Sequence, residues 1–209
     1  MSPRGDAPFL PHALIGSQAK PSTNLLKPYV DEGFLSADEC AHLRALATAQ
    51  AASKGRLAGG VQADAVRSVG ATWLDDTDEP WLAAKFARAL SQICANVFPF
   101  DIDGFDEGFQ LLRYEGAAGK PGDFYDWHAD IGRAGSTKRR KLSLVVQLSD
   151  PSAYEGGELT LNPGGSHMVA PKGEGTLIAF PSFVLHQVTP LEVGERVSLA
   201  AWAHGPAFR

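Results

Sequence analysis

The stretch Asp126-Trp127-His128-Ala129-Asp130 places a histidine and an aspartate two positions apart. In an extended strand alternate side chains leave on the same face, so these two project together with Cα atoms about 6 to 7 Å apart. That spacing suits two ligands of one metal ion, although the pair alone is also typical of exposed polar residues. A third ligand would complete a 2-His-1-carboxylate face, which leaves open positions on non-haem Fe(II). His186 is the best candidate for it.

A second pattern begins ten residues after His186, where Arg196 opens the alternating run Arg196-Val197-Ser198-Leu199-Ala200-Ala201-Trp202. Period-two alternation puts Arg196, Ser198 and Trp202 on one face of a strand. A guanidinium on an inward face requires an anionic partner, and its planar fork pairs with both oxygens of a carboxylate. The partner is either a bound carboxylic acid or an Asp or Glu of the chain, and the pattern leaves both open.

Five motifs in this order are typical of a known family. They are Gln110-Leu111-Leu112-Arg113-Tyr114, Tyr125 to Asp130, the strand Leu142 to Leu148, Glu155-Gly156-Gly157-Glu158-Leu159, and Phe180-Pro181 followed by His186, Arg196 and Ser198. With them, the segment from about Phe109 to Trp202 resembles the 2-oxoglutarate and Fe(II)-dependent oxygenases. Within that family it is most similar to the prolyl 4-hydroxylase-like group, which includes the bacterial PKHD-type hydroxylases.

The resemblance implies a role for four residues of the motifs. It implies that His128, Asp130 and His186 bind iron, and that Arg196 binds the far carboxylate of 2-oxoglutarate. Related halogenases replace the carboxylate ligand with a small residue to admit halide, so Asp130 argues for hydroxylation.

Three further residues are expected at the 2-oxoglutarate pocket. Ser198 shares a strand face with Arg196, and Tyr114 stands where the resembling enzymes place a Tyr near the co-substrate. A Tyr hydroxyl donates to a carboxylate while its ring excludes water. Strand parity also turns Gln147 toward this pocket, but some relatives have a Tyr at that position, so its contact with the co-substrate stays open.

Candidate substrate contacts come from the same strands and from a basic loop. Tyr125 lies within the second motif and Trp202 ends the resembling segment, while the loop Gly132 to Lys141 contains Arg139 and Arg140 directly after the His-x-Asp pair. Cations near the mouth of a site steer anionic ligands. The alternative interpretation of the basic run is an ordinary solvated loop.

The reaction implied by the resemblance is hydroxylation of an unactivated C–H bond by an Fe(II)- and 2-oxoglutarate-dependent dioxygenase. It consumes dioxygen and decarboxylates 2-oxoglutarate to succinate and CO2, with ascorbate as an optional reductant. The expected substrate is a free amino acid, a small metabolite or a prolyl residue. Two alternatives remain: an oxygenase acting on a protein side chain, and a non-catalytic or 2-oxoglutarate-independent cupin-like metal-binding jelly roll.

The rest of the sequence predicts a mainly β (α+β) fold. A capping box at Ser36-Ala37-Asp38-Glu39 begins a helix to about Ala52, and Asp78-Glu79-Pro80 begins another. Short runs at Lys27 to Val30 and Ser68 to Leu74 are expected strands, and from Phe109 short strands separated by Gly and Pro favour a β-sandwich or jelly roll. In the resembling family this is the double-stranded β-helix, with N-terminal supporting α-helices.

The expected domain organisation follows from these segments. Residues 1–24 are an extended or partly disordered N-terminal arm, and residues 25–209 form one oxygenase domain. Within this domain, residues 25–105 provide the helical support and residues 106–205 the jelly-roll core.

Composition excludes some classes of partner. The 209 residues have a formal net charge of −5, which gives no electrostatic reason to expect nucleic acid or a membrane surface as a partner. The N-terminus lacks a signal-peptide pattern, and no run of about 18 apolar residues occurs. We therefore expect a cytoplasmic protein whose partners are its substrate and dioxygen. The sequence does not predict the oligomeric state.

Overall fold

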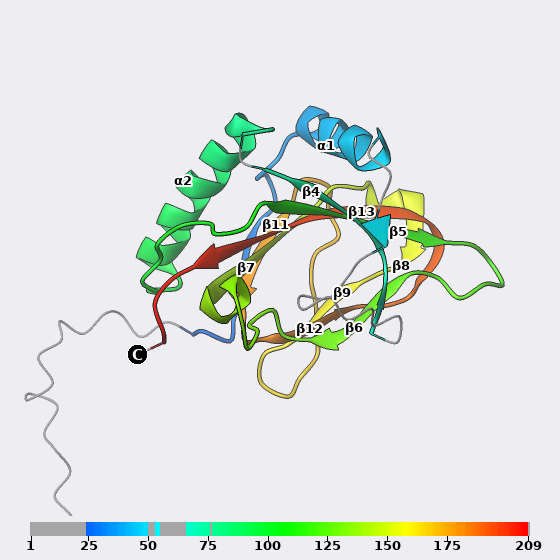
Figure 1. Cartoon of the computed structure of the whole chain (residues 1–209). Helices are drawn as coiled ribbons and strands as arrows, with labels where there is room; N and C mark the ends of the chain where they lie inside the picture. The colour runs from blue at the N-terminus through cyan, green and yellow to red at the C-terminus, as the bar shows by residue number, and fades with distance from the viewer. Residues whose placement is uncertain (1–23, 50–52, 55–65, 76, 209) are drawn as a thin grey trace, which may run out of the picture.

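The computed structural model describes residues 24–49, 53–54, 66–75 and 77–208 (Figure 1). The expected N-terminal arm 1–24 therefore lies outside the described residues except for Asn24. Residues 55–65, between Lys54 and Val66, also lie outside them.

Two antiparallel sheets face each other across the molecule (Figure 1). The larger, eight-stranded sheet contains β1 (Tyr29–Asp31), β2 (Ser53–Lys54), β4 (Gly70–Leu74), β5 (Phe109–Gly116), β7 (Arg140–Gln147), β8 (Tyr154–Gly156), β11 (Leu177–Pro181) and β13 (Leu191–His204). The smaller, five-stranded sheet contains β3 (Arg67–Ser68), β6 (Phe124–His128), β9 (Leu159–Asn162), β10 (Met168–Val169) and β12 (Leu185–Val188). This arrangement agrees with the predicted mainly β fold.

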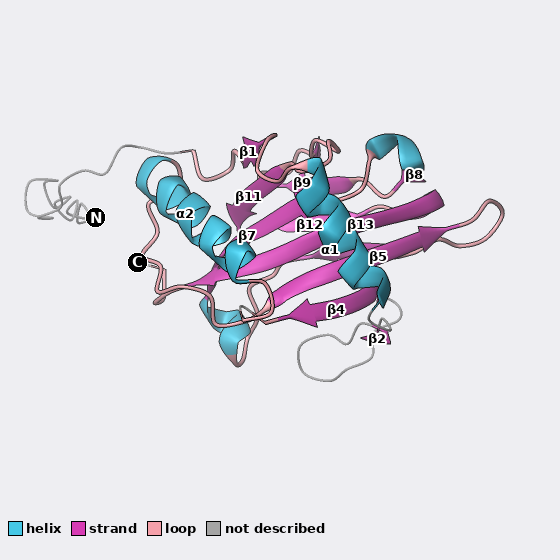
Figure 2. Cartoon of the chain, turned by 90° about the horizontal axis from the view of Figure 1, so that it is seen from above, coloured by secondary structure: helices cyan, strands magenta, loops and turns pink. Residues whose placement is uncertain are grey.

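Both helices of the described chain cover the outer face of the larger sheet (Figure 2). Helix α1 (Ala37–Ala49) begins with the predicted capping box, in which Ser36 N–H donates to Glu39 at 2.8 Å and Glu39 N–H donates to Ser36 Oγ at 3.3 Å. Helix α2 (Pro80–Asn96) has Pro at its first turn, as predicted. Neither helix combines the length and apolar character that a membrane crossing needs.

Alternation along the central strands builds one hydrophobic core on each face of the larger sheet. Leu111 of β5 and Leu199 of β13 pack with the helices. Their neighbours Leu112 and Ala200 belong to a second core between the two sheets. Because strand side chains alternate between faces, this second face also carries the polar residues of the candidate site.

The structure differs from the sequence expectations at three places. The strand expected from Ser68 to Leu74 is two strands, since β3 joins the smaller sheet and β4 the larger one, with Val69 between them. Strand β6 ends at His128, so Asp130 lies beyond it rather than within it. The basic segment Gly132 to Lys141 is not all loop, because a 3₁₀ turn η2 (Ser136–Arg139) leads into β7 at Arg140.

Candidate active site

Two strands of the smaller sheet bring three metal-binding side chains together. His128 at the end of β6 is the register partner of His186 on β12, and their ring centroids are 4.1 Å apart. Asp130 follows β6, where its backbone N–H donates to the carbonyl of Ser182 at 3.0 Å. One ligand atom from each of His128, Asp130 and His186 lies within 4.8 Å of the other two. The set suits one small cation.

Backbone contacts orient both imidazole rings toward Asp130. His128 Nδ1 lies 2.7 Å from the carbonyl oxygen of Asp126, and His186 Nδ1 lies 3.0 Å from that of Val184. Each Nδ1 must therefore hold the proton, which leaves the Nε2 lone pair free. The two Nε2 atoms lie 3.7 and 3.4 Å from the Asp130 carboxylate. This tautomer is the one that a metal ion requires.

Protonation states also suit metal binding. Burial, together with the charge of His186, lowers the pKa of His128 to about 4, so its imidazole is neutral at neutral pH. Burial alone would raise the pKa of Asp130, but the nearby His186, His128 and Arg140 charges and a hydrogen bond from Ser143 lower it to about 2. A neutral imidazole beside an ionised carboxylate is ready to coordinate a cation without first losing a proton.

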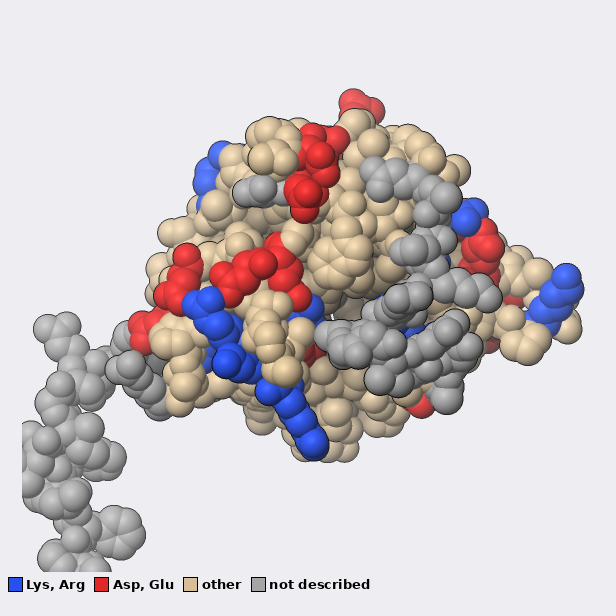
Figure 3. All heavy atoms as spheres, in the orientation of Figure 1, with Lys and Arg blue, Asp and Glu red and all other residues tan. Residues whose placement is uncertain are grey.

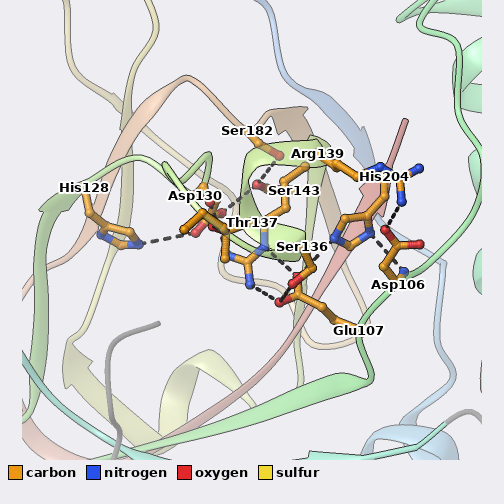
Figure 4. Close-up of polar contacts among 12 residues, drawn as sticks. Asp106, Glu107, His128, Asp130, Ser136, Thr137, Arg139, Ser143, Ser182 and His204 are labelled. Carbon is orange, nitrogen blue, oxygen red and sulfur yellow. Dashed lines mark hydrogen bonds and ion pairs between the residues drawn. The ribbon is translucent and has the colours of Figure 1, made fainter. Parts of the chain in front are cut away.

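The larger sheet holds Asp130 from the other side (Figure 4). Ser143 Oγ of β7 donates to Asp130 Oδ2 at 2.6 Å and lies 3.1 Å from Ser182 Oγ. Arg140 donates to the Asp130 backbone carbonyl at 3.2 Å. These contacts fix a carboxylate that lies outside any regular strand.

Arg196 of β13 is buried without an acidic partner. It is 1% exposed, and its hydrogen-bond partners among the described residues are the neutral side chains of Gln147 and Ser198 rather than a carboxylate. One terminal nitrogen donates to Gln147 Oε1 at 2.9 Å, the other lies 3.5 Å from Ser198 Oγ, and Nε has no hydrogen-bond partner. Its guanidinium carbon lies 5.1 Å from the centroid of the Tyr114 ring. A buried cation of this kind is expensive unless an anion joins it.

Two tyrosine hydroxyls near Arg196 are buried and have no hydrogen-bond partner. Tyr114 lies opposite Arg196 on β5, and burial raises the pKa of its hydroxyl to about 12, so it remains a donor. Tyr154 lies on β8 opposite Gly194. Burial also raises the pKa of Tyr154, while the charge of Arg196 opposes that rise. Sequence reasoning missed Tyr154, whose only signal was its place beside the Gly156-Gly157 motif.

A cavity of about 840 Å³ lies between the sheets and joins the metal-binding trio to Arg196. Figure 3 shows this face of the molecule hollowed near its middle, with acidic and basic side chains side by side next to the hollow. The predicted site residues that line it are His128, Asp130, His186, Arg196, Ser198, Tyr114, Tyr125, Trp202 and Arg140. The fold thus gathers most of the predicted site into one space.

Gln147 and Arg139 do not line the cavity. Gln147 is 1% exposed and lies behind Arg196, with its amide nitrogen donating to the Pro171 carbonyl at 3.1 Å. Gln147 therefore contacts Arg196 rather than the cavity. Arg139 forms ion pairs with Asp103 and Asp106 at the surface.

Aromatic rings border the metal-binding trio. The Tyr125 ring stacks on His128 with centroids 3.6 Å apart and planes 8° apart. The Trp202 ring lies under the Arg140 guanidinium, 3.8 Å from its carbon. Both rings restrict the motion of the polar group they cover.

Glu107 is a second residue that sequence reasoning missed (Figure 4). Arg140 donates to both of its oxygens at 2.7 and 2.9 Å, Ser136 donates at 3.1 Å, and His204 Nε2 lies at 3.1 Å. Burial would raise the pKa of Glu107, but the hydrogen bonds from His204 and Arg140 outweigh it and lower the pKa to about 2. No local pattern reveals this network, because Glu107 lies 33 residues from Arg140 and 97 from His204.

Comparison with known families agrees with this arrangement. Residues 109–204 match the family model of the 2OG-Fe(II) oxygenase superfamily. This segment belongs to the 2OG-Fe(II) oxygenase superfamily. The resemblance predicted from the sequence motifs is confirmed, and the matched residues include every member of the metal-binding trio as well as Arg196.

Curated relatives of this superfamily segment are bacterial hydroxylases. It is similar to the PKHD-type hydroxylase of Shewanella oneidensis, with 37% identity over 93 residues, 43% of this chain and 39% of the relative. A PKHD-type hydroxylase of Synechococcus sp. (strain CC9902) is 42% identical over 85 residues, 39% of this chain and 36% of that protein. The matched part thus spans about two fifths of these relatives.

Solved structures of two oxygenases share the fold. A Pseudomonas putida prolyl-4-hydroxylase has a TM-score of 0.67 and 24% identity, covering 86% of this chain and 93% of that one. A Trichoplax adhaerens prolyl hydroxylase, solved with a peptide fragment of the hypoxia inducible factor oxygen degradation domain, has a TM-score of 0.70 and 18% identity, covering 85% and 83%. The predicted double-stranded β-helix with supporting helices is confirmed.

Proposed function

We propose that this chain is an Fe(II)- and 2-oxoglutarate-dependent dioxygenase that hydroxylates an unactivated C–H bond. The strongest support is that one cavity contains two groups of side chains, each of which lacks a ligand. One is the His128, Asp130 and His186 trio, and the other is the group of buried donors around Arg196. The first site requires a cation and the second an anion, and 2-oxoglutarate on Fe(II) meets both needs.

The residues fit this metal and co-substrate. Two imidazoles and one carboxylate are the facial set that non-haem Fe(II) oxygenases use. The unpartnered Arg196 Nε and the hydroxyls of Tyr114 and Tyr154 are donors without acceptors. A carboxylate in their midst would satisfy them with charge-assisted hydrogen bonds.

The metal and the side chains around it have different tasks in the proposed reaction. Fe(II), when bound with 2-oxoglutarate and dioxygen, supplies the oxidising chemistry that converts 2-oxoglutarate to succinate and CO2. His128, Asp130 and His186 would hold the metal, and Arg196, with Ser198, would orient the far carboxylate. Gln147 holds Arg196 from behind with its amide oxygen. Ascorbate is proposed as an optional reductant.

The alternative functions receive less support. A 2-oxoglutarate-independent or non-catalytic jelly roll has no need for a buried arginine whose guanidinium lacks an acidic partner. We also propose that residues 25–209 work as one catalytic domain, because α1 and α2 share a hydrophobic core with the larger sheet. The substrate is an amino acid, small metabolite or prolyl residue, either free or within a protein.

The test is succinate formation from labelled 2-oxoglutarate by the purified Fe(II)-loaded protein against a panel of amino acids and proline-containing peptides. The proposal expects succinate to rise with one substrate class and to match hydroxylated product one to one. The His186→Ala protein should form none above background. Metal-independent turnover, or equal turnover by His186→Ala, would contradict the proposal.

A further inference from the structure

Arg140, at the start of β7, is a buried cation that contacts two acidic residues. Its guanidinium donates to both oxygens of Glu107, from Nε at 2.7 Å and from one terminal nitrogen at 2.9 Å. The other terminal nitrogen donates to the backbone carbonyl of Asp130 at 3.2 Å. Because a guanidinium pairs well with any carboxylate, the residue that neutralises Arg140 matters for a metal ion bound at Asp130.

A network of donors fixes Glu107 as the partner of this cation (Figure 4). Ser136 Oγ donates to Glu107 Oε1 at 3.1 Å. His204 Nδ1 accepts from the backbone N–H of Asp106 at 3.1 Å, so Nε2 carries the proton and donates to Glu107 Oε2 at 3.1 Å. Burial alone would raise the pKa of Glu107, but the hydrogen bonds from His204 and Arg140 lower it to about 2. Glu107 is therefore a fixed negative charge against the guanidinium.

The carboxylate of Asp130 points toward the metal-binding trio instead. Its Oδ2 accepts from Ser143 Oγ at 2.6 Å, and the Nε2 atoms of His128 and His186 lie 3.7 and 3.4 Å from the carboxylate. The charge of Arg140 still acts on this group. Burial raises the pKa of Asp130, and the charges of His186, His128 and Arg140 lower it.

A bound metal ion and Arg140 would thus compete for one carboxylate. Two cations repel each other more strongly in a partly dry site than in water. A buried guanidinium without a counter-charge is also unstable, and pairing with the Asp130 carboxylate would relieve it. Glu107 opposes both effects, because it neutralises the guanidinium. The Trp202 ring, 3.8 Å from the guanidinium carbon, restricts the movement of Arg140 further.

We propose that Glu107 is a positioning residue for the metal centre. It neutralises Arg140, so that this arginine holds the main chain of Asp130 without competing with Fe(II) for the Asp130 carboxylate. This inference rests on the proposed oxygenase function. It gives the pair of Glu107 and Arg140 an effect on metal affinity in addition to its effect on stability.

The experiment measures the Fe(II) affinity of the full chain, without 2-oxoglutarate, by anaerobic competition with a colorimetric chelator. Glu107→Gln keeps the size of the side chain and removes its charge. It should weaken Fe(II) binding roughly 10- to 100-fold, the usual effect of losing a residue that supports a metal ligand. Arg140→Gln removes the competing cation together with one hydrogen bond, so its Fe(II) affinity should lie closer to wild type than to Glu107→Gln.

The double variant Glu107→Gln/Arg140→Gln separates charge balance from a purely structural role. It should bind Fe(II) as Arg140→Gln does and more tightly than Glu107→Gln, because the uncompensated cation is gone. If the network only stabilised the fold, the second substitution would not restore metal affinity. The matched control is Glu195→Gln, which removes a carboxylate paired with Arg113 outside the cavity lining and should keep wild-type Fe(II) affinity.

Thermal unfolding of the metal-free proteins establishes that each variant is folded. Wild-type Fe(II) affinity in Glu107→Gln would overturn the inference, and so would a double variant that binds Fe(II) no more tightly than Glu107→Gln. Should Glu107→Gln not fold, the double variant decides, and a loss of about tenfold or more against wild type would overturn the inference. Failure of the wild-type chain to bind Fe(II) would instead contradict the oxygenase function on which the inference rests.

Discussion

Arg196 on β13 lies directly opposite Tyr114 on β5, with its guanidinium carbon 5.1 Å from the centroid of the tyrosine ring. Both side chains are buried, and each has a donor atom without a hydrogen-bond partner. A folded chain tolerates such a pair when a ligand completes it, because unpaired buried donors destabilise the protein. We therefore expect these two residues to affect the affinity for 2-oxoglutarate and the stability of the protein.

Replacing Arg196 with alanine should weaken 2-oxoglutarate binding without removing the metal. Loss of one partner of a desolvated charge pair is worth about 2 to 5 kcal/mol, which is roughly 30-fold to several thousand-fold in affinity. Lysine should restore only part of this, because it lacks the planar fork. Calorimetric titration measures the affinity for 2-oxoglutarate. The control is Arg113→Ala, which removes an arginine that lies on the other face of β5 and pairs with Glu195. Wild-type affinity in Arg196→Ala would make Arg196 a purely structural residue.

Tyr114→Phe should change stability and affinity in opposite directions. The hydroxyl of Tyr114 is buried and unpaired without ligand, so its removal should raise the free energy of unfolding by about 1 kcal/mol or more. The same change should lower 2-oxoglutarate affinity, because the ligand loses a donor. Thermal unfolding with and without 2-oxoglutarate distinguishes the two effects. A destabilised protein with unchanged affinity would contradict the proposed role.

His186→Ala should abolish binding of Fe(II) and turnover. The imidazole is one of three ligand groups gathered within 4.8 Å, and two remaining ligands hold the ion much less tightly. His167→Ala is the matched control, since His167 is exposed and lies outside that group. The measurement is the iron content of the wild-type protein and of each variant after dialysis. Full iron retention by His186→Ala would remove His186 from the ligand set.

The contribution of Glu107 to stability should depend on acid pH. Its folded-state pKa is lowered to about 2 from the ordinary value of 4.5, so its stabilising contribution is complete above about pH 4.5 and disappears as pH falls toward 2. The corresponding free energy is about 3 kcal/mol at most. Denaturant unfolding of wild type and Glu107→Gln should thus differ at pH 7 and converge in acid. The exposed Glu115→Gln serves as control, and a difference that does not vary with pH would refute this account.

The sequence predicted those parts of the site that follow from strand parity and motif order. Arg196 and Ser198 share a face as alternation requires, and Ser143, Val145 and Gln147 of β7 all turn toward the site. Strand parity predicts which face of the sheet a side chain occupies, but not which residue it contacts. Gln147 was therefore expected in the co-substrate pocket, whereas it is engaged by Arg196 outside the cavity lining.

Contacts between distant segments account for what was not predicted. Asp130 was expected within a strand, but it lies past the end of β6, where the Ser182 carbonyl and the Ser143 hydroxyl hold it. Arg140 looked like one of several loop cations, yet it is buried against Trp202 and Glu107. No local pattern encodes these pairings, because they exist only once both sheets have formed.

The most direct test of the central claim is an anaerobic titration of the Fe(II)-loaded wild-type chain with 2-oxoglutarate, followed by the metal-to-ligand charge-transfer absorption of the chelate. The account predicts a band that saturates at one 2-oxoglutarate per chain and is absent from His186→Ala. No band from the iron-loaded wild type, or an equal band from His186→Ala, would contradict it.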